Sequence, residues 1–497
     1  MFYWETHVGQ IDRIGATKAF FLAVILALVV APAAWAQDGF PGSLRALCDK
    51  GVVPFRIGTA VPLKGSRPGR SFNGYGPGIL THLDRDKAFQ AMVRGQFNQI
   101  EPENELKMMN VWTKGAALVN GRYVAQTNLF DKNGPLNQLC KWAESKSPRL
   151  TVRGHCIIYN QGYTLPKFPE GQPALFTRNG RQMVLNSPYK PSDLRDMMES
   201  YVRQVVDATM AQNAFSRRRY GYKVVEMWDV TNEVVEEQPR DPVPAQLGFA
   251  YRGSDPFYNC GPKTDGLNGY DYVGDIYKWA TQEMAGNVGK TIQGQKITAA
   301  DRFELYYNDY NLEWSASKLT YSLALIDHAR AAGGEVDGLG FQGHIQAKSL
   351  DTKQFDASIS AAIADKLRFA ITELDCAIRE NPGSGQPTVA EQETNQGNEY
   401  GEVARLCMAH KASCDCLQIW GATDDGSWIP NAEATPITRW VEDTRPGPTK
   451  GKVGYWPKEG QYDPVTVYDS FGGGPDTKSG HNISNAYDQI LSALNGG

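Results

Sequence analysis

The sequence predicts an α/β fold in which eight parallel strands form a closed (β/α)8 barrel. Short apolar segments that read as buried strands alternate along the chain with longer segments of helical periodicity. Two of these strands end abruptly in polar residues that include a glutamate, Glu233 in the fourth strand and Glu373 in the seventh. Because the carboxyl ends of all strands lie on one face of a parallel barrel, both carboxylates are expected on that face.

Each predicted strand is a run of mainly apolar residues. The clearest examples are the fourth, VVEMWDVTNE, and the seventh, LRFAITELDC. Trp228, which by strand alternation points away from Glu233, is expected in the core. In order, the strands are expected within residues 52–61, 97–109, 149–160, 224–233, 302–313, 336–345, 367–376 and 416–428. This count matches a TIM barrel with long loops on its active face.

Helical periodicity fills the intervals between the strands. Two long loops containing glycine and proline, 161–191 and 236–269, follow strands and are therefore expected on the active face. A third segment, 430–480, is longer than a barrel connection requires. The predicted helices lie at about residues 84–95, 192–213, 317–333 and 401–411, and a last helix at 485–494 is expected to close the barrel.

Length and charge limit the possible functions. The chain has 497 residues, and barrels of this class often exceed roughly 250 residues as one domain. A single, monomeric barrel domain is therefore expected over residues 37–497, with its extended loop at 430–480. The net charge of −4 argues against nucleic acid as a partner. The 11 Trp and 23 Tyr residues suit stacking on sugar rings as well as a large core.

The amino terminus predicts a cleavable secretory signal over residues 1–36. Basic Arg13 precedes an uninterrupted apolar run at 20–30, and the small residues Ala34 and Ala36 precede the expected cleavage point. An uncleaved membrane anchor is the alternative, but a run of 11 residues is short for a membrane span. The mature protein is therefore expected to be secreted or periplasmic, without membrane association after cleavage.

Glycoside hydrolysis requires two converging carboxyl groups, one to protonate the leaving oxygen and one to attack or to activate water. Glu233 and Glu373 are the candidate pair. The alternative for either residue alone is a salt bridge in the core, because a buried carboxylate needs a partner. The pKa values of the pair must also be pushed apart, so a less polar setting is expected around the acid.

Five sequence motifs carry a family resemblance. They are ENELK at residues 103–107, WDVTNE at 228–233, YYNDYN at 306–311, GLGFQGH at 338–344 and ITELD at 371–375. Together and in this order they resemble glycoside hydrolase family 10, the retaining endo-1,4-β-xylanases, over about residues 55–428. The resemblance implies a secreted enzyme that hydrolyses internal β-1,4-xylosidic bonds of xylan and needs no cofactor.

The resemblance also implies the roles of the reacting residues. Glu373 matches the nucleophile and Glu233 matches the acid/base. His344 and Asp375 resemble the pair that keeps the nucleophile ionised, since hydrogen bonds to the charged form lower the pKa of a carboxylate. Asn232 would hold the sugar 2-hydroxyl group. A retaining mechanism predicts that the two carboxyl groups lie about 5 to 5.5 Å apart.

Further residues match positions that bind sugar in the family. Glu103, Asn104 and Lys107 correspond to groups that hydrogen-bond sugar hydroxyls on the non-reducing side of the cut. His155 would contact the sugar next to the scissile bond. The remaining expected contacts are Tyr159, Asn308, Tyr310, Gln342 and the aromatic walls Trp420 and Trp428.

Three positions depart from the family pattern. Met108 and Tyr159 stand where the family has tryptophan, and Asn160 stands where it has histidine. A tyrosine ring has less stacking area than an indole, so the sugar-binding wall is altered. These changes leave open a retaining hydrolase of the same fold that cuts another β-glycan. A catalytically inactive polysaccharide-binding barrel is a further alternative, which the intact carboxylates disfavour.

Eight cysteines, all in the mature part, permit disulfide bonds in an exported chain. By the family resemblance, Cys407 and Cys414 form a disulfide before the last strand. Cys407, His410, Cys414 and Cys416 also have spacings of the kind that bind zinc, so a metal cluster is the alternative. We expect the disulfide and no metal.

Overall fold

The computed structural model describes residues 43–62, 87–377, 385, 387–421, 440–442, 452–454 and 486–496. All of these residues belong to one compact unit, Gly39–Gly497. The expected signal segment, Trp428 and most of the loop 430–480 lie outside the described residues. Within the described ranges, every helix is too short or too polar to cross a lipid bilayer.

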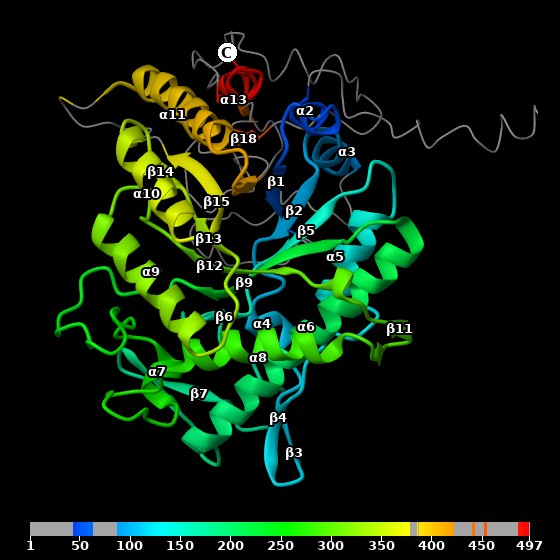
Figure 1. The fold of residues 1–497 in the computed structure, drawn as a ribbon, viewed down its shortest axis with the longest axis vertical. Coiled ribbons are helices and arrows are strands. Elements are labelled where there is room, and N and C mark those ends of the chain that lie inside the picture. The colour runs from blue at the N-terminus through cyan, green and yellow to red at the C-terminus, as the bar shows by residue number, and fades with distance from the viewer. Residues whose placement is uncertain are drawn as a thin grey trace, which may run out of the picture. The chain divides into compact units, whose positions relative to one another are not determined.

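Eight parallel strands close into a barrel (Figure 1). Each strand pairs with the next along the chain, and the last pairs with the first, Arg56 lying opposite Cys416. The predicted (β/α)8 barrel is therefore confirmed. The barrel strands are β1 (Arg56–Val61), β2 (Gln99–Pro102), β5 (Thr151–Gly154), β9 (Val225–Asn232), β12 (Glu304–Asp309), β13 (Gly338–Phe341), β15 (Arg368–Ala377) and β16 (Cys414–Ile419).

The barrel strands are apolar because their side chains are covered on both faces of the sheet. In β15, every residue from Phe369 to Cys376 is buried. The register of β12 against β9 shifts between Tyr306 and Tyr307, and such irregularities commonly redirect side chains near functional sites.

Two short strands extend the sheet beyond the barrel at the carboxyl ends of its strands. β6 (Ile158–Tyr159) pairs with β9, which sets Tyr159 opposite Asn232. β14 (His344–Gln346) pairs with β15, which sets His344 opposite Asp375. These extensions bring four of the predicted site residues into fixed register.

Helices follow the strands around the barrel (Figure 1). Two are longer than their periodicity predicted. α6 (Pro191–Tyr220) has three arginines in its last turn, where positive charge interacts favourably with the helix dipole. It stops at Gly221, whose φ is +82°. α11 (Val389–Ala409) begins at a capping box formed by Thr388 and Glu391. The others are α2 (Leu44–Asp49), α3 (Lys87–Gln96), α4 (Met108–Val111), α5 (Pro135–Glu144), α7 (Pro256–Cys260), α8 (Tyr272–Asn287), α9 (Ala316–Ala331), α10 (Thr352–Ala364), α13 (Ala486–Leu494) and the 3₁₀ helix η1 (Ala299–Asp301).

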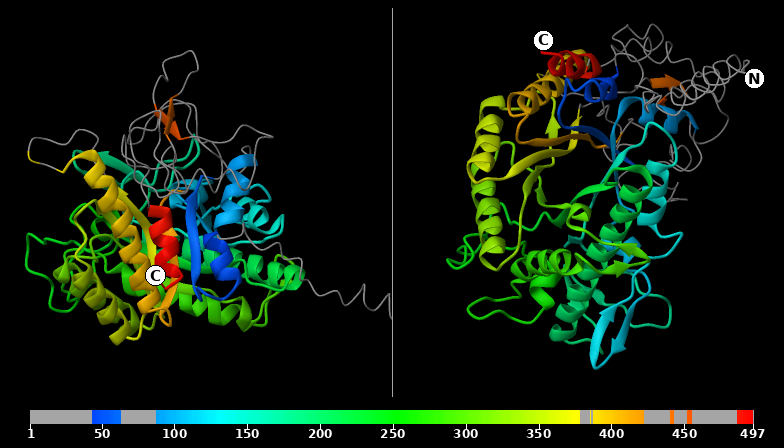
Figure 2. Two further views of the ribbon diagram at one scale, coloured as in Figure 1. Left: turned by 90° about the horizontal axis from the view of Figure 1, so that it is seen from above. Right: turned by 45° about the vertical axis from the view of Figure 1, so that its right-hand side comes forward.

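The last helix, α13, lies beside α11 (Figure 2). The hydroxyl of Tyr487 in α13 donates to Oε1 of Gln96 in α3, 2.7 Å away. The final helix therefore joins the last part of the barrel to the first, as the sequence predicted.

The long connections contain regular structure that their composition did not reveal. The loop 161–191 holds an antiparallel hairpin, β7 (Phe176–Asn179) and β8 (Gln182–Leu185), and the loop 236–269 holds α7. Further hairpins are β3 (Ala116–Val119) with β4 (Arg122–Ala125), β10 (Thr291–Ile292) with β11 (Gln295–Lys296), and β17 (Trp440–Glu442) with β18 (Lys452–Gly454).

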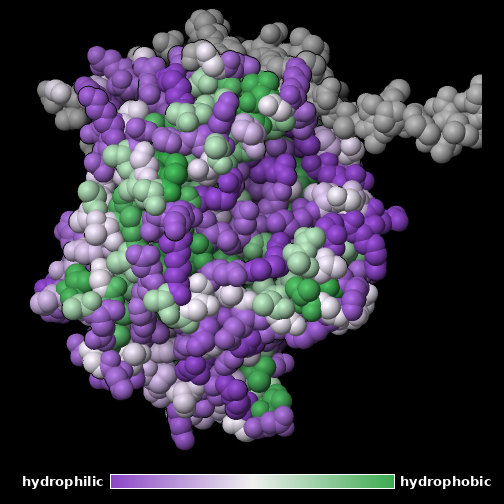
Figure 3. Space-filling view, in the orientation of Figure 1, coloured by the Kyte–Doolittle hydropathy of each residue, from purple (hydrophilic) through white to green (hydrophobic). Residues whose placement is uncertain are grey.

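Polar groups occupy the amino-terminal end of the barrel and much of the surface. A cavity of about 430 Å³ lies among the residues at the strand starts. In it, Arg56 pairs with Glu226 over 2.5 Å, and Arg368 pairs with Asp415. On the face drawn in Figure 3, apolar side chains form separate patches among hydrophilic ones.

Candidate active site

Side-chain amides at the carboxyl ends of β9, β12 and β13 connect the two candidate carboxylates. Glu233 directly follows β9, and Glu373 lies in β15. Nδ2 of Asn308 donates to Oε1 of Glu373 and to Oδ1 of Asn232, each over 2.8 Å. Nε2 of Gln342 donates to Oε1 of Glu233 over 3.1 Å and to Oδ1 of Asn232 over 3.4 Å. A continuous hydrogen-bond network therefore links the two glutamates.

Glu373 is 5% exposed and is surrounded by hydrogen-bond donors. Nε2 of His344 lies 3.3 Å from its Oε2, and Nδ1 of the same ring lies 3.0 Å from Oδ1 of Asp375. Burial alone would raise the pKa of Glu373. The hydrogen bond from His344 and the charges of His155, His344 and Lys107 outweigh burial and lower this pKa to about 2. Glu373 is therefore an ionised carboxylate at neutral pH.

His344 carries the positive charge that this arrangement requires. Burial opposes its charged form, but the contacts with Asp375 and Glu373 are stronger and raise the pKa of His344 well above its ordinary value. Both ring nitrogens then carry protons and donate, one to each carboxylate. The imidazolium holds Glu373 in place and favours its ionised form.

Glu233 occupies a different setting at the end of its strand. Its backbone has a φ of +52°, a left-handed conformation that is strained for a residue with a side chain. Its N–H donates to the carbonyl oxygen of Asn308, 2.9 Å away. Nη1 of Arg252 lies 2.9 Å from Oε2, and Gln342 donates to Oε1. Burial and then the charge of Glu233 raise the pKa of the nearby Tyr159 hydroxyl well above its ordinary value.

The sequence predicted a less polar setting around Glu233, and this prediction is wrong. The side chains in contact with the carboxyl group include a guanidinium and an amide. Trp228 is in the core as expected, 1% exposed, with Nε1 donating to Oγ1 of Thr209 over 3.1 Å. The polar setting arises because a bridge between Val235 and Tyr251 folds the loop 236–269 back against the strand end.

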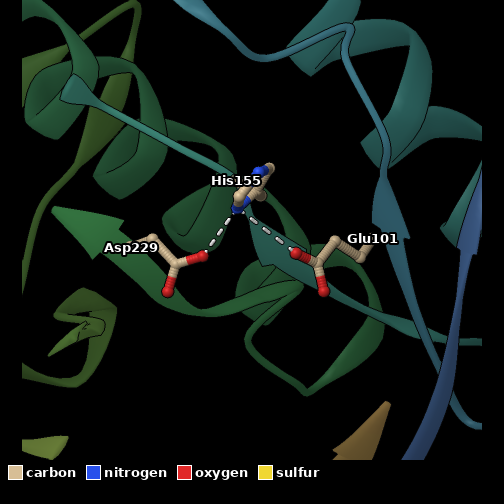
Figure 4. A group of neighbouring side chains, drawn as sticks. All are labelled: Glu101, His155 and Asp229. Carbon is tan, nitrogen blue, oxygen red and sulfur yellow. Dashed lines mark hydrogen bonds and ion pairs between the residues drawn. The ribbon is translucent and has the colours of Figure 1, made fainter. Parts of the chain in front are cut away.

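His155 is held in a buried network of charged groups (Figure 4). Its Nδ1 lies 2.8 Å from Oδ2 of Asp229 and 3.6 Å from Oε1 of Glu101. Arg153 donates to both carboxylates, to Glu101 over 2.5 Å. Burial raises the pKa of Glu101 well above its ordinary value, although Arg153 opposes the shift.

The same cluster is where described residues could hold a metal ion. Ligand atoms of Glu101, His155 and Asp229 lie within 4.8 Å of one another. The guanidinium of Arg153 already supplies positive charge to both carboxylates, so a divalent ion would have to displace it. The arrangement favours an ion-pair network that fixes the ring of His155.

The cluster Glu103, Asn104 and Lys107 follows β2 directly. Lys107 is 5% exposed, and its Nζ donates to Oδ1 of Asn104 over 3.1 Å. Burial would lower the pKa of Lys107, but nearby acidic groups, among them Glu373 and Glu233, outweigh burial and raise it. Lys107 therefore remains charged close to both catalytic candidates. Glu103 and Asn104 are partly exposed beside it.

Tyr159 and Asn160, the two departures in the third strand region, have separate contacts. The ring of Tyr159 lies 6.0 Å from the ring of Tyr163, and burial, with Glu233 and Tyr163 as further causes, raises the pKa of the Tyr159 hydroxyl. Nδ2 of Asn160 donates to Oδ2 of Asp255, 2.8 Å away. Because Asp255 caps the start of α7, Asn160 anchors the loop 236–269.

The expected aromatic contacts lie on two sides of the carboxylates. Trp420, 6% exposed, meets the rings of His155 and His344 edge-on at 5.4 and 6.4 Å. The hydroxyl of Tyr310 accepts from Nη2 of Arg252 over 3.3 Å. Asn308 is fully buried, and its Oδ1 accepts from Thr372, so its contacts are with protein groups. Trp428 lies outside the described residues.

Cys407 and Cys414 are free thiols in the structure, so the expected disulfide is not formed there. The two side chains are neighbours, and a hydrogen bond between them contributes to the raised pKa of the Cys414 thiol, after burial as the main cause. Nε2 of His410, a member of the alternative metal cluster, lies 2.6 Å from Oδ1 of Asp356.

Arg252 and Tyr163 are site residues that the sequence did not identify. Both lie in long loops without periodicity, where single residues carry no local signal. The only indication was that loops after barrel strands lie on the active face. That rule identified the segment 236–269 but no residue within it.

Comparison with known proteins agrees with this geometry. Residues 77–448 match the family described as "Glycosyl hydrolase family 10". Endo-1,4-beta-xylanase 1 of Humicola insolens is 37% identical over 128 residues, which cover 26% of this chain and 28% of that relative. Endo-1,4-beta-xylanase A of Caldicellulosiruptor sp. (strain Rt8B.4) is 23% identical over 401 residues, 80% of this chain and 46% of that relative. The chain thus spans less than half the length of these relatives.

Solved structures show the same fold. Native xylanase10C from Cellvibrio japonicus has a TM-score of 0.57 at 19% identity, covering 90% of this chain and 72% of that chain. A thermostable mutant of a xylanase (Xyn10A) from the same organism has a TM-score of 0.56 at 19% identity, covering 90% and 99%. With the family match extending over most of its length, the chain belongs to glycosyl hydrolase family 10.

Proposed function

We propose that the protein is a retaining endo-1,4-β-xylanase that hydrolyses internal β-1,4-xylosidic bonds of xylan. One observation carries the proposal: Glu373 is fixed in its ionised form by His344 and is linked through Asn308 and Asn232 to a second carboxyl group, Glu233. The names of the relatives, all endo-1,4-beta-xylanases, support the substrate, as does a Cellvibrio japonicus xylanase10C structure in complex with xylopentaose.

The reaction proceeds by double displacement. An oxygen of Glu373 attacks the anomeric carbon and forms a glycosyl ester, while the proton of Glu233 passes to the departing oxygen. Glu233, now a carboxylate, removes a proton from water, which attacks the same carbon and releases Glu373. Two inversions give net retention, and the carboxyl groups are predicted to lie about 5 to 5.5 Å apart.

The sugar next to the scissile bond would lie among polar groups that are already held in position. Lys107 and Asn104 are paired to each other, and His155 is fixed by Asp229. Asn232 is 1% exposed beside Glu233 and would hold the 2-hydroxyl group. Trp420 would form one wall of the cleft. Because these groups are ordered before the substrate binds, little reorganisation is needed in the transition state.

A second candidate is a retaining enzyme of the same fold that cuts another β-glycan. The observation that favours it is Tyr159, whose ring offers less area than the indole of the family and lies close enough to Glu233 for that charge to help raise its pKa, after burial as the main cause. An inactive polysaccharide-binding barrel is disfavoured by the intact environment of Glu373. We further propose that the protein is exported, loses residues 1–36 and acts as a monomer.

A side-by-side assay of the mature protein tests the proposal. Release of reducing sugar is measured on xylan and on a mixed β-glucan, with Glu373→Ala as the blank. The proposal predicts release from xylan that is absent in the variant. Release from glucan alone would support the second candidate, and binding of xylan without turnover would contradict both enzymes.

A further inference from the structure

Arg252 reaches the acid/base candidate from the long loop after β9. Its backbone N–H donates to the carbonyl oxygen of Val234, 3.1 Å away, and its own carbonyl oxygen accepts from Asp255 over 2.9 Å. Asp255 is held in turn by Asn160. The main chain of Arg252 is therefore fixed beside Glu233, and the long side chain is the part that can move.

The guanidinium of Arg252 touches two groups. Nη1 lies 2.9 Å from Oε2 of Glu233, and Nη2 lies 3.3 Å from the hydroxyl of Tyr310. The guanidinium carbon is 5.6 Å from the centre of the Tyr310 ring. The side chains of Arg252 and Glu233 are 21% and 14% exposed, so neither charge would be stranded in an apolar core if the pair opened.

This contact conflicts with the first step of hydrolysis. A charged donor at Oε2 favours the carboxylate form of Glu233, and the amide of Gln342 at Oε1 does the same. The first step needs the carboxylic acid form of Glu233. Its proton would then face an N–H donor, of Arg252 or of Gln342, instead of an acceptor. The second step, in which Glu233 acts as a base, needs the carboxylate. The contacts of Glu233 therefore suit the second step better than the first.

Other charged and titratable groups also face Glu233 from the surrounding elements. One of these is a cation, Lys107, which has its own partner in Asn104. Among the described residues, those whose own pKa is affected by Glu233 are Lys107, Cys156, Tyr159, Tyr163, Arg252, Asp309 and Tyr310. Among these described groups, Arg252 is the cation in direct contact with the carboxyl group.

We propose that Arg252 is a positioning residue that holds Glu233 ionised in the free enzyme and is displaced by the sugar on the leaving-group side of the cleft. The inference rests on the proposed function. The leaving oxygen must approach Glu233, so the sugar that carries it enters the space of the guanidinium. The hydroxyl of Tyr310 already accepts from Nη2 of Arg252, so this contact can persist when the pair with Glu233 opens, while Nζ of Lys318 lies over the Tyr310 ring, 3.1 Å from its centre. Cleavage is thereby restricted to chains with a sugar beyond the cut.

The wild-type enzyme tests this without any substitution. The pH profile of kcat/KM reports the free enzyme, and that of kcat reports the enzyme–substrate complex. With xylohexaose, we expect the basic limb of kcat to lie at a higher pH than the basic limb of kcat/KM, by about one pH unit or more. Coincident basic limbs would overturn the proposal.

Arg252→Gln gives the second test, with two substrates. For xylohexaose, the basic limb of kcat/KM should move up by about one pH unit or more, whereas Arg252→Lys should keep the wild-type limb. The value of kcat/KM for dinitrophenyl β-xylobioside, which reports formation of the glycosyl ester with a leaving group that needs no proton, should change by less than about twofold. Arg330→Gln, which breaks a partly exposed pair with Asp365 of the same 2.9 Å length, is the matched control and should leave both profiles unchanged.

The outcomes separate the inference from the proposed function. An unmoved limb in Arg252→Gln, or equal losses on both substrates, would mean that Arg252 has only a structural role. If the wild-type enzyme turns over neither substrate, the proposed function itself fails.

Discussion

The surroundings of Glu373 and Glu233 differ in the elements that supply their partners. Glu373 lies within a barrel strand, and its donors Asn308 and His344 come from β12 and β14, which belong to the same sheet. Glu233 lies one residue beyond its strand with a φ of +52°, and its charged donor Arg252 comes from a long loop. The partners Asn308 and His344 of Glu373 belong to the sheet, whereas the charged partner of Glu233 comes from a loop outside the sheet.

The difference matches the number of protonation states that each group would adopt in the proposed mechanism, with Glu373 as the nucleophile and Glu233 as the acid/base. A nucleophile has to be ionised whenever substrate arrives, so a rigid sheet with an imidazolium partner suits it. An acid/base changes its protonation twice in each cycle, so a partner on a long side chain that can leave is an advantage. The reaction that a group carries out can therefore decide which part of the fold supplies its hydrogen-bond partners.

The largest effect is expected from Glu373→Ala. Without the nucleophile, no glycosyl ester forms, and kcat on xylan should fall on the order of 10⁵-fold, as for the loss of other enzymic nucleophiles. A reducing-sugar assay measures it. Glu402→Ala removes a partly exposed glutamate of α11 and should leave the rate unchanged. If Glu373→Ala kept an activity close to that of the wild type, Glu373 would not be the nucleophile, and the comparison of the two glutamates would fail.

Glu233→Ala should cause a smaller loss that depends on the leaving group. On xylan, removal of a general acid is expected to slow turnover by roughly 10²- to 10⁴-fold. On dinitrophenyl β-xylobioside, formation of the glycosyl ester should persist, and azide should restore turnover by replacing water as the nucleophile. Loss of equal size on both substrates, without rescue by azide, would leave Glu233 with no acid/base role.

His344→Gln tests why the nucleophile stays ionised. The pKa of Glu373 is about 2, below its ordinary value of 4.5, so the ionised form adds stability above pH 4.5 that is lost as the pH falls towards 2. Removing the imidazolium removes the strongest interaction that lowers the pKa of Glu373 against the effect of burial. The acid limb of kcat/KM should therefore move up by roughly one to two pH units.

The control for His344→Gln is His328→Gln. His328 pairs with Asp271 over 2.6 Å on the helix α9 and has no contact with either glutamate among the described interactions. Its replacement should not move the acid limb. A limb that stays in place in His344→Gln would mean that the sheet alone keeps Glu373 ionised.

Much of the barrel was predictable because strand periodicity is local. The strands that carry Glu233 and Glu373 follow from short motifs read in order, although β15 does not end at Glu373 as expected and continues to Ala377. The pairing of His344 with Asp375 was expected from the family resemblance. Arg252 was not predictable, because its position depends on how a long loop folds back through the bridge of Val235 and Tyr251. The prediction of a less polar acid failed for the same reason.

Asn160 shows the same limit from another side. Its partner Asp255 is 95 positions away in the sequence, so no local pattern connects them. The extra length of α6 was missed because its last turns are polar and lack the periodicity of a buried face. Contacts that depend on loops or on distant residues require the folded chain.

The smallest effect is expected from Asn160→Ala. The change leaves one oxygen of the buried Asp255 without this donor and should lower the free energy of unfolding by about 1–3 kcal/mol, measured by urea denaturation. Activity should fall by less than about tenfold, because Glu373 is untouched. Asn259→Ala in the same loop removes an exposed hydrogen bond to Gly253 and should change stability by about 0.5 kcal/mol or less. A larger loss of unfolding free energy in Asn259→Ala than in Asn160→Ala would mean that the contact between Asn160 and Asp255 is not the main one that stabilises the loop.

Trapping the glycosyl-enzyme tests the central assignment most directly. The mature protein is incubated with a 2-fluoro xylobioside that carries a good leaving group, digested and examined by mass spectrometry. We expect one added disaccharide on the peptide that contains Glu373, and no addition in Glu373→Ala. A label on another residue, or turnover of xylan with inversion at the anomeric carbon, would contradict it.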